Sequence, residues 1–351
     1  MKKKWLQRLG LGLSAFMISG CQLGYLVDTA RHHYRVMNKR IPVDEALQSS
    51  SLTDEQKRKL RLSQEARQFA QKLGLKVSKN YSLYTQLDQP YVTYVVRVSP
   101  EYDLSPHTWW FPIIGSVPYK GFPTKKQAEQ EAKKFPEDQF DTYVRGVSAY
   151  STLGYFVDPI LSSMLRYSDY DLVNLIIHES VHATIYISSA ADFNERLANF
   201  IGDLGAELYF KKIEGQDSPT LEQLSQSKKN QQRTLTFLSQ EVTDLAKWYK
   251  DNKGKLSPEK KQQRFQQIKS RYKDTVAPHV SESQSKAFLK TPLNNARLAS
   301  FRTYSYNMDE FERAYAKLGS DFDAFLTFAK SLEDADDPEK SLKDFASPVI
   351  R

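Results

Sequence analysis

Two histidines and a glutamate in one apolar stretch have the residue types and the spacing of a metal site. His178 and His182 are four positions apart, so on a helix both imidazoles leave the same face and can bind one ion. Glu179 lies next to the first histidine, where its carboxylate can take a proton from a metal-bound water without being a ligand. This HExxH pattern predicts one Zn²⁺ per chain and hydrolytic chemistry at the ion.

The alternative is an ordinary pair of core histidines that matches the pattern by chance. The chain has only 6 His, and any short motif carries this risk. The motif lies, however, in the most apolar helical stretch of a polar protein, residues 172–187, where a buried His or Glu is costly unless it is paired or binds a metal. We therefore favour the metal site.

Glu195 is the candidate third ligand. It follows His182 by thirteen residues, and a helix predicted from residue 192 to about residue 212 can return its carboxylate to the ion after a short turn. Asp192 and Glu195 also form a D-x-x-E pair, a capping box in which Glu195 would bond to backbone instead of metal. Spacing leaves both roles open, and we favour the ligand.

The elements that must position these residues change in type along the chain. Ser168 can cap the metal helix, with Asp171 in its first turn. Upstream, the residue pattern predicts strands at 91–98, 109–114 and 142–147, and helices from Ser51 or Thr53 to residue 73 and at 124–135. The sequence therefore predicts an α+β fold that is mainly helical, with a small β-sheet preceding the HExxH helix and a C-terminal helical region.

Helical spacing dominates the C-terminal part. Residues 221–249 and 258–272 predict an antiparallel hairpin broken near Gly254, which we interpret as a scaffold arm closing one side of the cleft rather than a partner-binding module. Asn307 and Glu310 predict a capping box for a helix to residue 318, and a last helix spans 321–332. The polar residues 333–351 predict a loose tail.

The N-terminal residues have the features of a lipoprotein signal. A basic segment (residues 1–8), a short apolar segment (9–18) and small residues before Cys21 are typical of a secretory signal and not of a membrane span. The sequence Ile-Ser-Gly-Cys at 18–21 resembles the bacterial lipobox, which implies cleavage before Cys21 and acylation of its thiol. Cys21 is the only cysteine, which fits a lipid attachment point and excludes an intrachain disulfide. The alternative is a cleaved secretory signal with an incidental cysteine.

The overall charge gives no reason to expect a nucleic-acid partner. The formal charge is +8, and removing residues 1–20, which hold four basic residues and no acid, lowers it to +4. No basic patch interleaved with aromatic residues occurs, so we expect no nucleic acid.

The metal segment resembles the gluzincin pattern of zinc peptidases. That pattern is HExxH plus a glutamate from a following helix, here His178 to His182 and then Asn194-Glu195. More narrowly, the chain resembles a family of bacterial lipoproteins described as predicted aminopeptidases. The similarity extends over residues 110–115 with Tyr119 and Gly121, 146–154, 158–161, the metal segment to Gly202, and 293–298 with Tyr304.

The resemblance implies a role for each site residue. Zinc would bind His178, His182 and Glu195, with water in the fourth position and Glu179 as the general base. An oxyanion donor is also expected, usually Tyr or His. Tyr304 is our choice, with Tyr306, Tyr150 and Tyr155 as rivals, and each of the four can instead be a packing residue.

The chain departs from thermolysin-like enzymes in two respects. The interval from His182 to Glu195 is shorter, and Asn199 stands where those enzymes commonly carry an Asp that supports a ligand histidine. The acidic motif with which other zinc aminopeptidases grip a free α-amino group is not recognisable either, so aminopeptidase activity follows from the family label alone. Residues 148–158 are a candidate edge strand for the substrate backbone.

These observations predict a zinc-dependent peptidase, an aminopeptidase by resemblance, acting on peptide substrates at the bacterial cell envelope. Gln22 after Cys21 resembles sorting to the outer membrane, with the protein lipid-anchored on its periplasmic side. Two alternatives stay open: a non-catalytic binding lipoprotein and a zinc hydrolase of peptidoglycan peptides. The expected divisions are a lipoprotein signal peptide (1–20), a lipid-anchored segment (21–50), a zinc metallopeptidase core (51–214), a helical region completing the cleft (215–332) and the polar tail (333–351).

Overall fold

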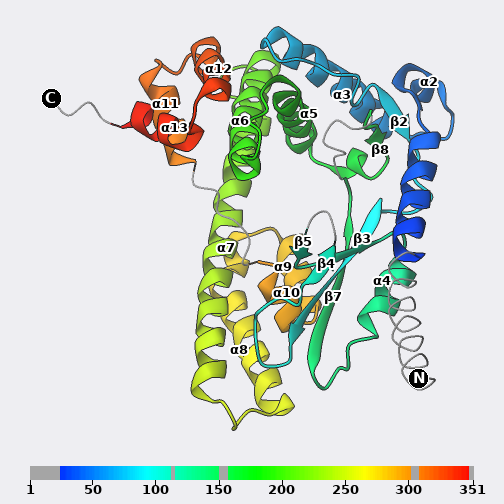
Figure 1. Cartoon of the computed structure of the whole chain (residues 1–351), viewed down its shortest axis with the longest axis vertical. Helices are drawn as coiled ribbons and strands as arrows, with labels where there is room; N and C mark the ends of the chain where they lie inside the picture. The colour runs from blue at the N-terminus through cyan, green and yellow to red at the C-terminus, as the bar shows by residue number, and fades with distance from the viewer. Residues whose placement is uncertain (1–23, 112–114, 150–156, 302–307, 348–351) are drawn as a thin grey trace, which may run out of the picture.

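The computed structural model describes residues 24–111, 115–149, 157–301 and 308–347 of the 351-residue chain. The fold is α+β and mainly helical, as predicted, with small sheets between an N-terminal helical segment (residues 24–38) and the metal helix. Figure 1 shows the helices gathered at two ends of the molecule, joined on one side by the long helix α7 (Pro219–Asp251).

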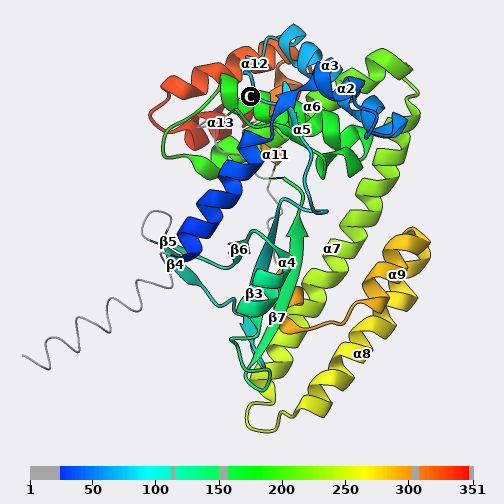
Figure 2. The same cartoon turned by 90° about the vertical axis from the view of Figure 1, so that its right-hand side faces the viewer.

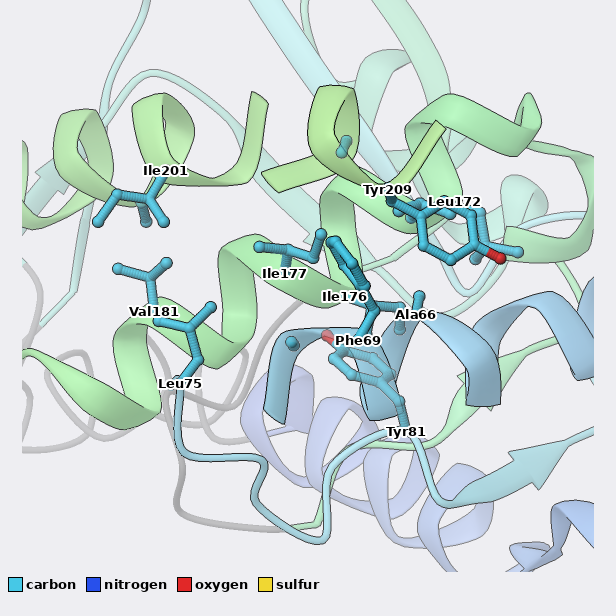
Figure 3. Close-up of a cluster of buried hydrophobic side chains, with 14 of the residues drawn as sticks. Ala66, Phe69, Leu75, Tyr81, Leu172, Ile176, Ile177, Val181, Ile201 and Tyr209 are labelled. Carbon is cyan, nitrogen blue, oxygen red and sulfur yellow. The ribbon is translucent and has the colours of Figure 1, made fainter. Parts of the chain in front are cut away.

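The first end holds the HExxH helix and the largest core. Its helices are α2 (Val43–Gln48), α3 (Asp54–Lys72), α5 (Asp169–Thr184), α6 (Ala191–Glu214), α11 (Asp309–Lys317), α12 (Phe322–Ser331) and α13 (Pro338–Ala346). The apolar faces of α3, α5 and α6 interlock there, with Phe69, Ile176 and Ile201 among the buried side chains (Figure 3). Burial of these faces fixes the orientation of α5, and therefore the direction in which its polar face points.

The start and the end of α3 follow from local chemistry. Thr53 caps the helix through a capping box with Gln56, so of the two predicted caps the structure selects Thr53. Gly74 follows the last turn with φ of +77°, a conformation that suits glycine and ends the helix as predicted.

Three small sheets precede the metal helix. They are β1 (Ile41–Pro42), β2 (Leu83–Thr85) and β8 (Ile160–Leu161); β6 (Lys120–Phe122), β3 (Thr93–Pro100) and β7 (Phe140–Val147); and β4 (Trp109–Phe111) with β5 (Gly115–Val117). In the central sheet β3 pairs antiparallel with β7 from Thr93↔Val147 to Pro100↔Phe140. Alternate residues of β3, Tyr94, Val96 and Val98, pack with the buried alanines of α4 (Lys125–Ala132).

The predicted helical hairpin is confirmed and forms a second core. Helices α7 and α8 (Pro258–Thr275) pack with α9 (Glu282–Lys290) and α10 (Asn295–Ala299) around Leu238, Leu245 and Ile268. Lys261 of α8 forms an ion pair with Asp141 of β7, and Asn295 donates hydrogen bonds to the carbonyls of Pro100 and Glu101. The hairpin region therefore packs on the central sheet.

The prediction of a loose tail is wrong for residues 338–346. They form α13, capped by Asp337, and bury Leu342 and Ala346 against the core that contains the metal helices. The few apolar residues of this segment lie one turn apart, which is sufficient for docking although the composition is polar. The short 3₁₀ helix Leu332–Asp334 connects it to α12, and similar turns occur at Met164–Arg166 and Ala277–His279.

Several predicted boundaries also shift. Helix α5 ends at Thr184 and not Ile187, because Ile185 is extended. The N-cap of α11 is Met308, without a side-chain cap, and the predicted cap Asn307 lies outside the described residues. Cys21 lies outside them as well, and no helix in the described ranges is long and apolar enough to cross a membrane.

Candidate metal centre

Helix α5 presents the HExxH residues on its half-buried face. The hydroxyl of Ser168 accepts a hydrogen bond from the Asp171 backbone N–H at 3.0 Å, so the predicted N-cap is confirmed. The opposite face, with Leu172, Ile176 and Ile177, is completely buried. His178, Glu179 and His182 are left between this core and solvent.

Helix α6 approaches α5 closely because two glycines face it. A Cβ at Gly202 would lie 3.2 Å from the Cβ of His178, and one at Gly205 would lie 2.9 Å from Cγ2 of Ile177. Side chains at these positions would push the helices apart. The glycines therefore set the spacing across which a residue of α6 can meet the histidines.

The connection between the two helices is held by Asn194. Its buried side chain accepts a hydrogen bond from the Ile187 N–H at 3.0 Å and donates one to the Ile187 carbonyl at 2.8 Å. These two hydrogen bonds to the backbone of one residue fix the tight turn and the first turn of α6. The adjacent residue, Glu195, is thereby directed towards α5.

The structure brings His178, His182 and Glu195 together. The two Nε2 atoms are 3.1 Å apart, and the carboxylate oxygens of Glu195 lie 3.7 Å from Nε2 of His178 and 3.4 Å from Nε2 of His182. One ligand atom from each residue falls within 4.8 Å of the others, so these three could hold a metal ion. The capping-box alternative for Glu195 is wrong, because α6 begins at Ala191 without a side-chain cap.

Burial and hydrogen bonding hold the ligands in the protonation states that a metal requires. Burial, and then the neighbouring His182, lower the pKa of His178 to about 4, although the charge of Glu195 and the hydrogen bond to Asn199 act in the opposite direction. The hydrogen bond with His182 is the main cause that lowers the pKa of Glu195. At neutral pH the centre therefore offers a neutral imidazole at His178 and an ionised carboxylate.

Two polar side chains of α6 lie behind His178, and sequence reasoning missed one of them, Asp203. Asn199, which stands where thermolysin-like enzymes commonly carry a supporting Asp, forms a hydrogen bond with His178. One turn further along α6, Asp203 accepts hydrogen bonds from Asn174 at 2.6 Å and Tyr170 at 2.9 Å. Residues 195, 199 and 203 share one helix face by their spacing of four, which is the signal that could have found them.

Glu179 lies beside a second feature that the sequence did not reveal. Tyr81 is buried, and burial followed by the charge of Glu179 raises its pKa well above the ordinary value. Its φ of +60° is unusual for a residue with a side chain. The Tyr81 N–H donates to the Asp158 carbonyl at 2.7 Å and its carbonyl accepts from Gln64 at 2.9 Å, which holds this conformation.

Other predicted site residues cannot be placed. Tyr304, Tyr306, Tyr150 and Tyr155 lie outside the described residues, so the choice of Tyr304 as oxyanion donor stays a prediction. Of the predicted edge strand, the described residues 148–149 and 157–158 have no strand structure. The carbonyl of Ser148 accepts a hydrogen bond from Ser163, which ties the start of this segment to the metal-bearing end of the fold.

Comparison with known proteins gives one match. A family model described as "Putative aminopeptidase" covers residues 24–343, nearly all of the described chain and the whole metal centre. No curated protein and no solved structure matches.

Proposed function

The chain belongs to this aminopeptidase family, and from that premise we propose that it is a zinc-dependent peptidase of the bacterial cell envelope. The family name suggests a peptidase acting on peptide substrates. The metal, the residue roles and the location are our additions. They are argued below from the metal centre and from the N-terminal sequence.

The spacing of the three ligand atoms carries the zinc proposal. A tetrahedral zinc with bonds of about 2.0–2.1 Å separates its ligand atoms by about 3.3 Å. The two Nε2 atoms are 3.1 Å apart, Oε1 of Glu195 lies 3.4 Å from Nε2 of His182, and Oε2 of Glu195 lies 3.7 Å from Nε2 of His178. Two imidazoles and one carboxylate also match the donor set of catalytic zinc sites that leave one position open.

The residues around the ion would divide the work of hydrolysis. Zinc, when bound, lowers the pKa of a coordinated water to about 7 and polarises a carbonyl. Glu179 accepts the proton of the attacking water and returns it to the leaving amine. The side chain of Glu195 is 43% exposed, against 13% for His178 and 18% for His182, so the substrate reaches the centre from the Glu195 side.

The envelope location follows from the N-terminal sequence. The lipobox-like residues before Cys21 support cleavage and acylation there, and Gln22 supports the periplasmic side of the outer membrane. Acylation is tested by mass spectrometry of the membrane-extracted protein. A Cys21→Ser variant should lose the lipid mass.

A Glu179→Gln variant tests the catalytic proposal. We expect about one zinc per chain in both parent and variant, because Glu179 is no ligand, and hydrolysis of a mixed peptide library only in the parent. The matched control is Glu312→Gln, an exposed position on α11, which should retain both. Hydrolysis that survives Glu179→Gln would remove the general-base role, and a parent that binds zinc without cleaving any peptide would favour the binding lipoprotein. Peptides with free and acetylated N-termini then separate aminopeptidase from endopeptidase action.

A further inference from the structure

Large apolar side chains are exposed mainly at one corner of the molecule. Of eight such residues in the described chain, five belong to the N-terminal helical segment or to β4 and the loop before β6. We call these five the apolar corner: Leu26 (45% exposed), Val27 (39%), Tyr34 (68%), Trp110 (62%) and Tyr119 (43%). Such a gathering on a soluble fold marks a surface that contacts something else.

On the helical segment the apolar residues form a stripe. Leu26, Ala30 and Tyr34 follow one another at a spacing of four, and Val27 precedes Ala30 by three, so all four share one exposed face. The adjacent face of the helix carries the exposed side chains of Arg31, Arg35 and Asp28. An apolar stripe beside a mainly basic one is the pattern of a helix that lies in a membrane interface.

Aromatic contacts bring the β4–β5 hairpin to the start of this helix. The ring of Tyr25 lies 6.0 Å from that of Phe111 and 5.5 Å from that of Phe122, and the Lys120 ammonium lies 4.7 Å from the Tyr25 ring centre. Trp110, next to Phe111, is therefore at the same corner as Leu26. Figure 2 shows the labelled strands β4 and β5 beside the beginning of the helical segment.

The position of this corner along the chain identifies its occupant. Gly24, where the described chain begins, is three positions after Cys21. Three residue steps span at most about 10 Å. A bilayer that held an acyl chain on Cys21 would therefore lie within reach of Gly24, the residue before Tyr25 and Leu26.

We propose that the apolar corner binds the surface of a phospholipid bilayer as a second, non-covalent attachment. This inference rests on the lipid anchor of the proposed function for its geometry, but the surface itself is described independently. Trp and Tyr are favoured at the depth of the headgroups, and one lipid chain alone gives only marginal membrane binding. Figure 1 places the strands β4 and β5 below the end of the molecule that holds α5 and α6.

Vesicle binding by the unlipidated chain tests the proposal. The described contacts all lie from residue 24 onward, so a chain that starts at residue 22 keeps them. It should bind vesicles of phosphatidylethanolamine and phosphatidylglycerol in flotation, with a blue shift of tryptophan emission. Trp110→Ser and Leu26→Ser should each lower the partition coefficient about tenfold. Replacing Arg31 or Arg35 by Gln should lower it about fivefold at low salt.

Two exposed residues elsewhere serve as matched controls. Ile213→Ser (54% exposed) and Leu235→Ser (36%) remove similar apolar side chains from α6 and α7 and should leave vesicle binding unchanged. The proposal would be overturned if the parent chain did not bind vesicles, or if the corner variants had the same partition coefficient as the parent. Loss of self-association in Trp110→Ser without a change in partition would overturn it too, by assigning the corner to a second copy. Zinc content and peptide hydrolysis are measured in solution without vesicles. A failure of the proposed peptidase function is therefore distinguished from a failure of membrane binding.

Discussion

Two antiparallel helix pairs of this chain differ in the groups that compensate the charge of a glutamate between the helices. In the hairpin, Glu241 of α7 is 6% exposed at its side chain and is neutralised by Arg271 of α8, whose guanidinium nitrogens lie 2.5 and 2.6 Å from the carboxylate. In the α5–α6 pair, Glu195 meets only the two histidines within the described part of the chain. The hairpin carries its own cation, whereas the α5–α6 pair brings together two imidazoles and a carboxylate that could hold a metal ion.

The packing of the two pairs agrees with this difference. The hairpin is held by large side chains such as Tyr249, Phe265 and Tyr272, which fill the space between its helices. The α5–α6 pair instead brings its backbones together at Gly202 and Gly205. Because the backbone of α6 lies this close to the Cβ of His178, we expect the packing of the two helices to set the positions of the three proposed ligands.

Removing a proposed zinc ligand from the α5–α6 pair should have the largest effect on zinc binding and activity. His182→Ala leaves two ligand atoms, so we expect loss of stoichiometric zinc and of peptide hydrolysis. Zinc at a hundredfold excess over its dissociation constant stabilises the folded parent by about 2.7 kcal/mol. Thermal unfolding with and without zinc should show this shift in the parent and none in His182→Ala. A zinc-induced shift that persists in the variant would mean that the ion binds elsewhere.

Removing the hairpin's own cation should destabilise the fold without affecting zinc. Arg271→Ala leaves Glu241 buried and uncompensated, and losing one partner of a fully buried pair costs about 3–5 kcal/mol. Because the arginine side chain is 40% exposed, we expect about 2 kcal/mol in urea unfolding. Zinc content measured on the folded variant should equal that of the parent. Stability unchanged by the substitution would show that water replaces the arginine.

The comparison also shows which features the sequence could predict. The HExxH helix with its Ser168 cap, the α7–α8 hairpin and the long strands were predictable, because caps and apolar periods are local signals. The parallel pairing of β2 with β8 was not, since it joins two- and three-residue strands that are distant in the chain and have no period. Helix α13 was missed because few of its residues are apolar.

The grouping of His178, His182 and Glu195 was predictable, but the side chains that support it were not. Glu195 was identified by its distance from His182 along the chain, with the capping box as a competing role that only the position of the helix start could exclude. The double hydrogen bond of Asn194 to Ile187 and the contact between Tyr81 and Glu179 depend on how distant segments pack. No local pattern encodes contacts of that kind.

A methyl group at Gly202 should weaken the centre without unfolding it. In Gly202→Ala the new Cβ would lie 3.2 Å from the Cβ of His178 and 3.4 Å from the Asn174 carbonyl, so His178 must move by a few tenths of an ångström. We expect about a tenfold weaker zinc affinity, measured by competition with a chelator, because supports behind a ligand are typically worth 10–100-fold. Helix propensity favours alanine, which keeps the fold stable. Unchanged affinity would show that the close approach is not needed for ligand geometry.

The smallest expected effect concerns how α5 is anchored at its N-terminus. Asp169 forms ion pairs with Arg58 at 2.7 Å and Lys59 at 2.5 Å, and the hydrogen bond from Arg58 is the first cause that lowers the pKa of Asp169 to about 2. A carboxylate whose pKa is lower in the folded protein stabilises it above its unfolded pKa of about 3.9, and this contribution is lost as the pH falls towards 2. Asp169→Asn should therefore cost about 1 kcal/mol at pH 7, after allowance for a side chain that is 32% exposed, and this difference should vanish near pH 2. Urea unfolding of parent and variant at pH 7, 4 and 2 measures it, with Asp323→Asn on α12 as the control. If the difference in free energy of unfolding between parent and variant stayed constant from pH 7 to pH 2, Asp169 would stabilise α5 by packing and not by its charge. Helix α5 would then be held as the hairpin is, by side-chain packing.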